Sequence, residues 1–198
     1  MTDNFASFSA AVQSETGYVD ARLGLADALR RSGQLEQSLS QYERIVAIDP
    51  RVVKARFGHA AALIRLKRYQ EARDRLAEAM DLHPDEVSFA HAAARLLAAA
   101  PDDRVRDGRR AMVIAQMLLD RLPRTIELAE TMAMTSAEVG QYSDAVLWQQ
   151  QAIDAAGHAG RRDLMERLTG NLKLYQANRP CRTPWRSDEP IEFSLAIQ

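Results

Sequence analysis

Two stretches of the chain share one pattern: GQLEQSLSQYERIVAIDP at residues 33–50 and KRYQEARDRLAEAMDLHP at residues 67–84. Their closing prolines, Pro50 and Pro84, lie 34 residues apart. Within each stretch an apolar or small residue recurs every three or four positions, which is the spacing of one face of an α-helix. A repeat of this length predicts a stack of similar helical units, each of which packs against its neighbours.

Each repeat is predicted to be a helix hairpin, because a second amphipathic stretch precedes the quoted one, at residues 19–31 and again at residues 53–66. Small residues, Ala26 and Ala60, lie where the two helices of a hairpin cross and allow the helix axes to approach. Gly33 supplies the turn between the first two helices, since glycine tolerates a left-handed backbone. The closing prolines end the second helices because proline cannot donate the helical hydrogen bond.

Two further copies follow, and the first of them is longer. Its closing Pro123 lies 39 residues after Pro84, and the extra residues are assigned to the loop at residues 101–106. The segments are assigned as an N-terminal cap, four repeats, a capping helix and a non-helical tail: 1–17, 19–52, 53–86, 87–125, 126–157, 158–177 and 178–198. Abundant alanine and only 6% aromatic residues favour closely packed helices over sheets, so the expected class is all-α.

The pattern of residues 19–84 resembles the tetratricopeptide repeat in its small, aromatic and proline positions. The run PDDRVRDGRRA (101–111), with GQYSDAVLWQQQAIDAA (140–156) and LTGNLKLY (168–175), is similar to the C-terminal repeats of bacterial tetratricopeptide proteins of the planctomycete type. The resemblance covers about residues 19–180. It implies an α-solenoid of about four helix hairpins with a C-terminal capping helix, and it says little about function because such repeats serve many roles.

Charge and composition argue against several partners. The 26 basic and 27 acidic residues give a formal charge of −1, so no global field would gather nucleic acid or an anionic membrane. No stretch approaches the roughly 20 apolar residues that span a bilayer. Cys181 is the only cysteine, which excludes an intrachain disulfide and a thiolate metal cluster and fits a reducing compartment. We therefore expect a cytoplasmic protein that binds neither nucleic acid nor membrane.

The candidates for catalysis are the four histidines, His59, His83, His91 and His158, and the acidic pair Asp102 and Asp103. The histidines lack the spacing of metal ligands, and we interpret them as structural or solvated. The acidic pair is explained better by turn geometry and helix capping. No catalytic motif is present, so we expect no enzyme activity, no catalytic residue, no cofactor and no metal.

The remaining candidate for a functional site is the groove on the concave side of the predicted helix stack. In tetratricopeptide stacks the first helix of each hairpin lines the concave side, and this predicts the following partner-binding residues: Leu23, Asp27, Arg30, Lys54, Phe57, Ile64, His91, Arg95, Glu130 and Met134. Phe57 and Ile64 are predicted to anchor the partner, with Lys54 and Arg95 orienting it. The alternative for Phe57 and Ile64 is packing against the neighbouring first helices, and both readings stay open here.

The family resemblance also bears on how a partner would be held. The chaperone-binding members of the family hold a terminal carboxylate with a clamp of lysine and asparagine. The corresponding positions here are Leu23 and Asp27, so we do not expect that clamp.

The C-terminal segments are expected to differ from the repeats. Residues 161–176 form a capping helix, with Arg162, Arg167 and Lys173 away from its apolar stripe. In the tail, Ile191 begins an alternation of apolar residues that suits an extended strand. We expect this tail to dock on the chain's own groove or capping helix, or on a partner. Disorder is the alternative.

Together these features favour an adaptor or stabilising subunit that binds a protein or peptide partner in a hetero-oligomeric complex through the groove, and possibly through the tail. The alternative is an accessory or regulatory subunit that assists a separate catalytic chain.

Overall fold

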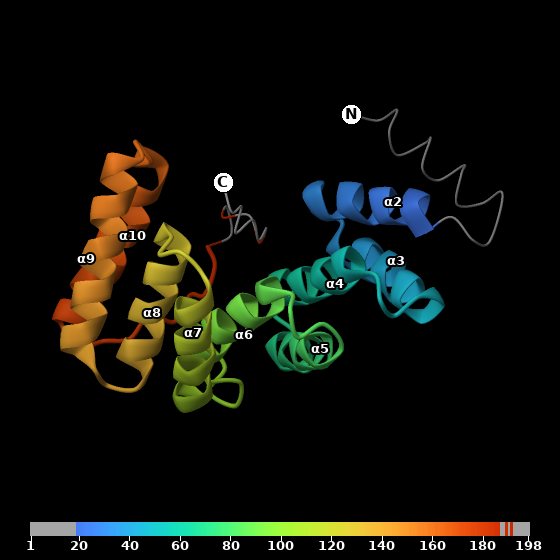
Figure 1. Ribbon diagram of the computed structural model, residues 1–198. Helices are drawn as coiled ribbons and strands as arrows, with labels where there is room; N and C mark the ends of the chain where they lie inside the picture. Colours follow the sequence, from blue (N-terminus) through green and yellow to red (C-terminus); the bar gives the residue numbers. More distant parts are fainter. Residues whose placement is uncertain (1–18, 187–188, 190, 192–198) are drawn as a thin grey trace. The chain divides into compact units, whose positions relative to one another are not determined.

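The structure is a computed structural model that describes residues 19–186, 189 and 191 (Figure 1). These residues form nine helices and no strand, so the prediction of an all-α solenoid of helix hairpins is confirmed. The chain divides into two compact units, Met1–Pro84 (unit 1) and Asp85–Gln198 (unit 2). The predicted N-terminal cap, residues 1–17, lies outside the described residues.

Unit 1 contains two helix hairpins. The first is formed by α2 (Val19–Arg31) and α3 (Leu35–Ile48), and the second by α4 (Val53–Arg65) and α5 (Tyr69–Leu82). Each helix packs against the next, and the two first helices, α2 and α4, also touch. Gly33 lies in the predicted turn with φ of 82°, as the sequence pattern requires.

Tyr42 of α3 ties the two hairpins of unit 1 together. Its ring lies so close to Gly58 of α4 that a Cβ atom added at Gly58 would come within 2.3 Å of Tyr42 Cζ. Glycine is therefore required at this contact. The Tyr42 hydroxyl donates to Asp27 Oδ1 at 2.5 Å and accepts from Arg30 Nε at 3.3 Å. The remaining buried residues of this cluster are Ala26, Ile45 and Ala55.

Unit 2 contains two hairpins and one further helix. The hairpins are α6 (Val87–Ala99) with α7 (Gly108–Arg121), and α8 (Ile126–Glu138) with α9 (Tyr142–His158). The last helix, α10 (Arg162–Gln176), packs on α9 as the predicted capping helix does. Here too the first helices, α6 and α8, touch.

The extra residues of the third repeat form the loop between α6 and α7, as expected. Asp102 Oδ1 accepts a hydrogen bond from the Arg104 amide at 3.0 Å and so stabilises a turn. The helix cap is a different aspartate: Asp107 accepts from the Arg110 amide at 2.9 Å at the start of α7. Asp102 thus stabilises a turn, as predicted for the acidic pair, whereas the residue that caps the helix is Asp107.

A small apolar cluster holds α8, α9 and α10 together. Its buried members are Ala129, Ala152, Ala156 and Leu168. Small residues at three of these four positions let the helix axes approach closely. Beyond α10 the chain turns at Asn178, whose φ is 51°, and the described residues that follow are not helical.

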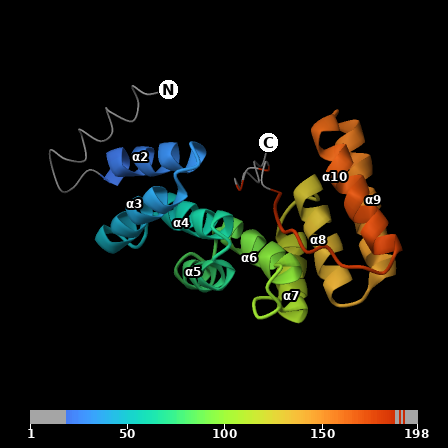
Figure 2. The same cartoon turned by 180° about the vertical axis from the view of Figure 1, so that it is seen from behind.

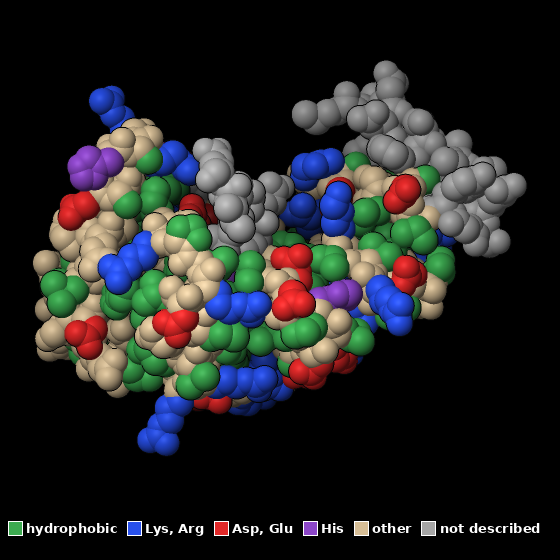
Figure 3. All heavy atoms as spheres, in the orientation of Figure 1, with side chains coloured by type: hydrophobic (Ala, Val, Ile, Leu, Met, Phe, Trp, Pro, Cys, Tyr) green, Lys and Arg blue, Asp and Glu red, His purple; other side chains and the backbone are tan. Residues whose placement is uncertain are grey.

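The surface of the described residues mixes both signs of charge, as the near-zero net charge predicts. On the face shown in Figure 3 basic and acidic side chains are interspersed among apolar ones. None of the described helices is long and apolar enough to cross a membrane.

Candidate functional site

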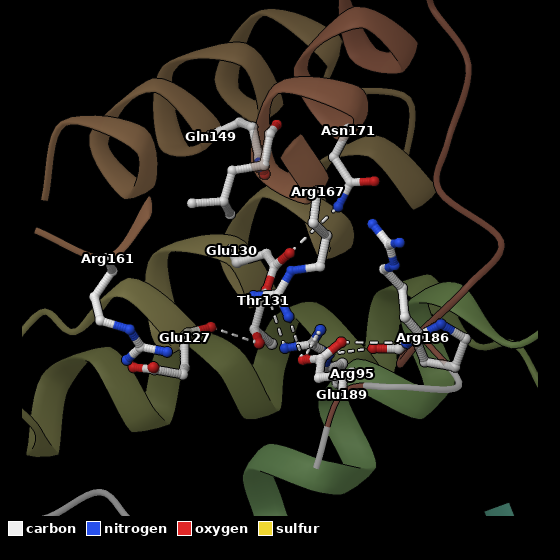
Figure 4. Close-up of polar contacts among 12 residues, drawn as sticks. Arg95, Glu127, Glu130, Thr131, Gln149, Arg161, Arg167, Asn171, Arg186 and Glu189 are labelled. Atoms are coloured by element: carbon white, nitrogen blue, oxygen red, sulfur yellow. Dashed lines mark hydrogen bonds and ion pairs between the residues drawn. The ribbon is translucent and has the colours of Figure 1, made fainter. Parts of the chain in front are cut away.

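A buried cluster of charged side chains lies at the centre of unit 2 (Figure 4). Glu130 of α8 is fully buried, and its Oε2 lies 3.1 Å from Arg95 Nη1 of α6 and 3.0 Å from Arg167 Nη2 of α10. Its Oε1 accepts from Asn171 Nδ2 at 3.3 Å. A carboxylate taken out of water is costly unless it is paired in this way. We call the surface of α6, α8 and α10 that carries Arg95, Glu130 and Arg167 the first-helix face of unit 2.

The C-terminal tail lies on this face. Figure 2 shows the tail, in red, passing across α8. Arg95 Nε donates to the main-chain carbonyl of Pro184, and the Arg95 guanidinium lies over the Trp185 ring, 5.3 Å from its centroid. Glu189 Oε1 lies 2.9 Å from Arg95 Nη2 and 2.6 Å from Arg167 Nη1. One non-helical segment, in which the Glu189 amide donates to the Arg186 carbonyl at 3.2 Å, therefore contributes a carbonyl, an aromatic ring and a carboxylate to these two arginines.

A second ion pair fixes the start of the tail. Arg182 Nη1 lies 2.5 Å from Glu138 Oε2, and the same carboxylate pairs with Arg106 Nε at 3.2 Å. Cys181 and Ile191 are buried. Burial raises the pKa of the Cys181 thiol, so the thiol is protonated at neutral pH and packs as an apolar group.

The electrostatics of the cluster keep Arg95 charged. Burial alone would lower the pKa of Arg95, but the carboxylates of Glu130 and Glu189 outweigh it and raise that pKa. The neighbouring His91 behaves oppositely. Burial, together with the positive charge of Arg95, lowers the pKa of His91 from 6.5 to about 3, so its imidazole is neutral and bonds to Thr131 Oγ1 at 2.8 Å.

The order of helices, the hairpin packing and the sequence pattern can now be compared with known proteins. The sequence family described as tetratricopeptide repeat matches residues 6–52 and 23–87. Residues 6–87 therefore match the tetratricopeptide repeat family, and the described residues have the fold of such repeats.

Two solved structures share the fold of this chain. A tetratricopeptide repeat protein from Parabacteroides merdae ATCC 43184 aligns with a TM-score of 0.73 and 13% identity, over 88% of this chain and 66% of that chain. YrrB, described as a TPR protein with an unusual peptide-binding site, aligns with a TM-score of 0.61 and 15% identity, over 86% of this chain and 92% of that chain. Identities this low show the fold alone. No curated protein matches the chain.

The ten predicted groove residues fall into three groups by exposure. Lys54 is exposed. Four residues of unit 1 are half-buried: Leu23, Asp27, Arg30 and Phe57. The other five are buried: Ile64, His91, Arg95, Glu130 and Met134. The structure brings Arg95 and Glu130 into one ion pair under the tail, so a partner reaches them only where the tail is lifted.

The groove residues of unit 1 have their own contacts. Leu23 packs against the cluster around Tyr42, and Asp27 and Arg30 both bond to the Tyr42 hydroxyl. Burial, followed by the hydrogen bond and charge of Asp27, raises the pKa of Tyr42 well above its ordinary value, so the hydroxyl is a permanent donor. Lys54 is left as the exposed cation of the predicted set.

The histidine predictions can also be followed in the structure. His59 of α4 lies 3.8 Å from Glu43 Oε1, and burial, aided by the charges of Arg75, Arg68 and Arg56, lowers its pKa from 6.5 to about 4. Within the described part of the chain, no group of three histidine, cysteine, aspartate or glutamate residues could hold a metal ion.

Sequence reasoning missed four members of the cluster: Arg167, Asn171, Trp185 and Glu189. Arg167 was expected away from the apolar stripe of α10, where a charge is normally solvated, but its side chain is only 11% exposed and faces Glu130. The signal that could have found it is Glu130, which lies among apolar residues of α8 with no basic residue on the same helix, since a buried carboxylate demands cations from neighbouring elements.

Proposed function

We propose that this protein binds a protein or peptide partner through its first-helix faces, as an adaptor or stabilising subunit of a hetero-oligomeric assembly, and that it performs no chemistry of its own. One observation carries the proposal: the first-helix face of unit 2 holds a non-helical chain segment by its carbonyl, ring and carboxylate groups. Side chains that recognise one such segment are suited to recognise another.

Unit 1 supports the same function with a more accessible surface. Lys54 is exposed and Phe57 is half-buried on α4, three residues apart and therefore on one side of the helix. An aromatic side chain beside a cation is a common anchor in protein interfaces. The solved relative YrrB carries a peptide-binding site by its own description, which is consistent with this use of the fold.

The test combines identification of the partner with a matched pair of substitutions. Tagged full-length protein is purified from the source cells, the partners are identified by mass spectrometry, and binding is then measured with the purified partner. Phe57→Ala should weaken binding by about 2 kcal/mol or more, roughly 30-fold, with an unchanged melting temperature. The control is Leu82→Ala, because Leu82 is an exposed apolar residue of the second helix α5.

Two results would overturn the proposal. One is recovery of the chain alone, as a monomer, under conditions in which it is folded. The other is a Phe57→Ala protein that loses thermal stability while it binds the partner as well as the Leu82→Ala control.

A further inference from the structure

We propose that the first-helix face of unit 2 is a binding site for a non-helical acidic segment of a partner protein, and that this segment takes the place of the chain's own tail. The partner's carboxylate would then lie between Arg95 and Arg167, where Glu189 lies in the structure. The inference rests on the proposed function and specifies the chemistry of the partner at one of its faces.

The charges of the cluster favour an anionic ligand. Arg95 and Arg167 carry two positive charges, and Glu130 supplies one negative charge, so Glu189 balances the group. Arg95 is only 2% exposed and Glu130 is fully buried. When the tail is lifted, the group keeps one positive charge that no carboxylate of the cluster balances. A partner that displaces the tail and brings a carboxylate restores this balance, so an acidic partner is favoured over a neutral one.

The two guanidinium groups are held in place independently of the tail. Glu130 Oε2 accepts from both arginines, through Arg95 Nη1 and Arg167 Nη2, and Asn171 bonds to the other oxygen of Glu130. This leaves Arg95 Nη2 and Arg167 Nη1 directed at a common point, occupied by Glu189 Oε1. A receptor whose donors are already oriented spends little conformational entropy on binding. Planar guanidinium groups are also the donors best matched to a carboxylate.

The tail also indicates the form of the ligand. Besides the carboxylate, it provides the Pro184 carbonyl and the Trp185 ring to Arg95, so the recognised element is a stretch of main chain with an aromatic residue four positions before an acid. This pattern favours a peptide over a free small anion. In this buried setting two polar atoms, Arg167 Nε and the Tyr175 hydroxyl, have no hydrogen-bond partner among the described residues.

Self-occupancy by the tail predicts a specific competition. If the tail covers the site for most of the time, the affinity for an external peptide is reduced by the fraction of molecules in which the site is free. Weakening the tail without altering the arginines should then strengthen binding of the external peptide. Glu189→Gln does this, because it removes the tail's charge and leaves Arg95, Glu130 and Arg167 intact.

The experiment uses the full chain and a fluorescent peptide with the sequence of residues 179–191, in which Cys181→Ser prevents oxidation. Binding is followed by fluorescence anisotropy. The Glu189→Gln protein should bind this peptide at least about tenfold more tightly than the wild type. Glu166→Gln, a change of an exposed glutamate on α10, should bind it like the wild type. A second peptide carrying Glu189→Gln should bind the Glu189→Gln protein at least about tenfold more weakly than the first.

A second protein variant keeps the test informative if Glu189→Gln fails to fold. Trp185→Ala removes the ring that lies over Arg95 and leaves the charged cluster unchanged, so it too should strengthen peptide binding. Equal affinities in all four proteins would overturn the proposal, and so would equal affinities of the glutamate and glutamine peptides. Displacement of the peptide by inorganic phosphate at a similar concentration would also overturn it, because the site would then accept anions in general.

The two proposals fail in different ways. If the peptide does not bind while Phe57→Ala still weakens binding of the partner, then the proposed site for an acidic segment is wrong and the proposed binding function stands. If no partner is recovered and the peptide binds as expected, then the face of unit 2 recognises its own tail and the proposed function lacks support.

Discussion

The first-helix faces of the two units use charge differently. In unit 1, Asp27 and Arg30 bond to the Tyr42 hydroxyl at the edge of the core, and the Asp27 side chain is still 35% exposed. In unit 2, Arg95 and Glu130 are buried and covered by the tail. The same repeat architecture therefore presents one face whose charges reach solvent and one whose charges are balanced internally. We therefore expect the burial of these charges, and not their identity, to decide how much each contributes to stability.

Removing the buried carboxylate should produce the largest effect. Glu130→Gln leaves Arg95 and Arg167 without their shared counter-charge and should destabilise unit 2 by about 3 kcal/mol or more. The matched change in unit 1 is Asp27→Asn, which weakens one partly exposed hydrogen bond and should cost only about 1 kcal/mol. Urea unfolding followed by circular dichroism measures both. Equal losses in the two variants would show that burial does not separate the faces.

Detaching the tail should have an intermediate effect. Glu189→Gln removes the carboxylate that two arginines share, and we expect a loss of about 1–2 kcal/mol, because the Glu189 side chain keeps some exposure to water. The tail should also loosen, which would shift the tryptophan emission to longer wavelength as Trp185 leaves Arg95. Glu166→Gln on the exposed side of α10 is the control and should change neither quantity. An unchanged emission spectrum in Glu189→Gln would contradict the docking of the tail through this residue.

The helices could be predicted from the sequence because their cause is local. The spacing of apolar residues, Gly33 at the first turn and the small residues at the crossings determine each hairpin without reference to distant parts of the chain. The longer loop after α6 followed from counting residues between Pro84 and Pro123. These are properties of single repeats, and because they recur in each copy they are easier to recognise in the sequence.

The charged cluster could not be predicted in the same way because its cause is long-range. Glu189 pairs with Arg95, 94 residues earlier in the sequence. An amphipathic pattern places Arg167 on the polar side of α10 but does not distinguish a solvated arginine from one that faces a buried glutamate. Arg95 and Glu130 were expected on the groove, and the tail was expected to dock there, on the capping helix or on a partner, but no pattern in the sequence indicated which tail residues would pair with Arg95 and Arg167. The predicted roles of the ten groove residues stay predictions.

Both units should lose stability as the pH falls, each through one histidine. The pKa of His59 in unit 1 is lowered to about 4 and that of His91 in unit 2 to about 3, from an ordinary value of 6.5. Below pH 6.5 the unfolded chain binds protons that the folded chain does not, so stability is complete above pH 6.5 and declines below it. Each histidine should contribute roughly 1 kcal/mol per pH unit down to about pH 4.

The histidine contribution is isolated by comparing variants. His59→Gln and His91→Gln should each flatten the dependence of unfolding free energy on pH between 6.5 and 5, relative to the wild type. His158→Gln, at an exposed position at the end of α9, should leave the dependence unchanged. A wild-type slope that survives in both buried variants would assign the pH dependence to the carboxylates instead.

The smallest expected effects concern the turns, where backbone strain at a single residue decides the sign of the change in stability. Gly33 has φ of 82° and Lys67, at the equivalent turn 34 residues later, has φ of 60°. A left-handed conformation costs a non-glycine residue about 1–2 kcal/mol, whereas replacing glycine by alanine saves about 0.4–1 kcal/mol of unfolded-chain entropy. The strain is the larger quantity. Gly33→Ala should therefore destabilise unit 1, and Lys67→Gly should stabilise it, each by roughly 0.5–1 kcal/mol.

Unit 2 supplies the control for these turn variants. Gly157 lies inside α9 with open space around the position of an added Cβ atom, so Gly157→Ala introduces no strain and should stabilise the helix by up to about 1 kcal/mol. The same substitution, glycine to alanine, is thus expected to have opposite signs at Gly33 and Gly157. Thermal unfolding of the three variants measures the difference. If Gly33→Ala stabilises the protein as Gly157→Ala does, then residue 33 does not adopt the left-handed backbone conformation in solution. The turns at Gly33 and Lys67 would then differ in backbone conformation.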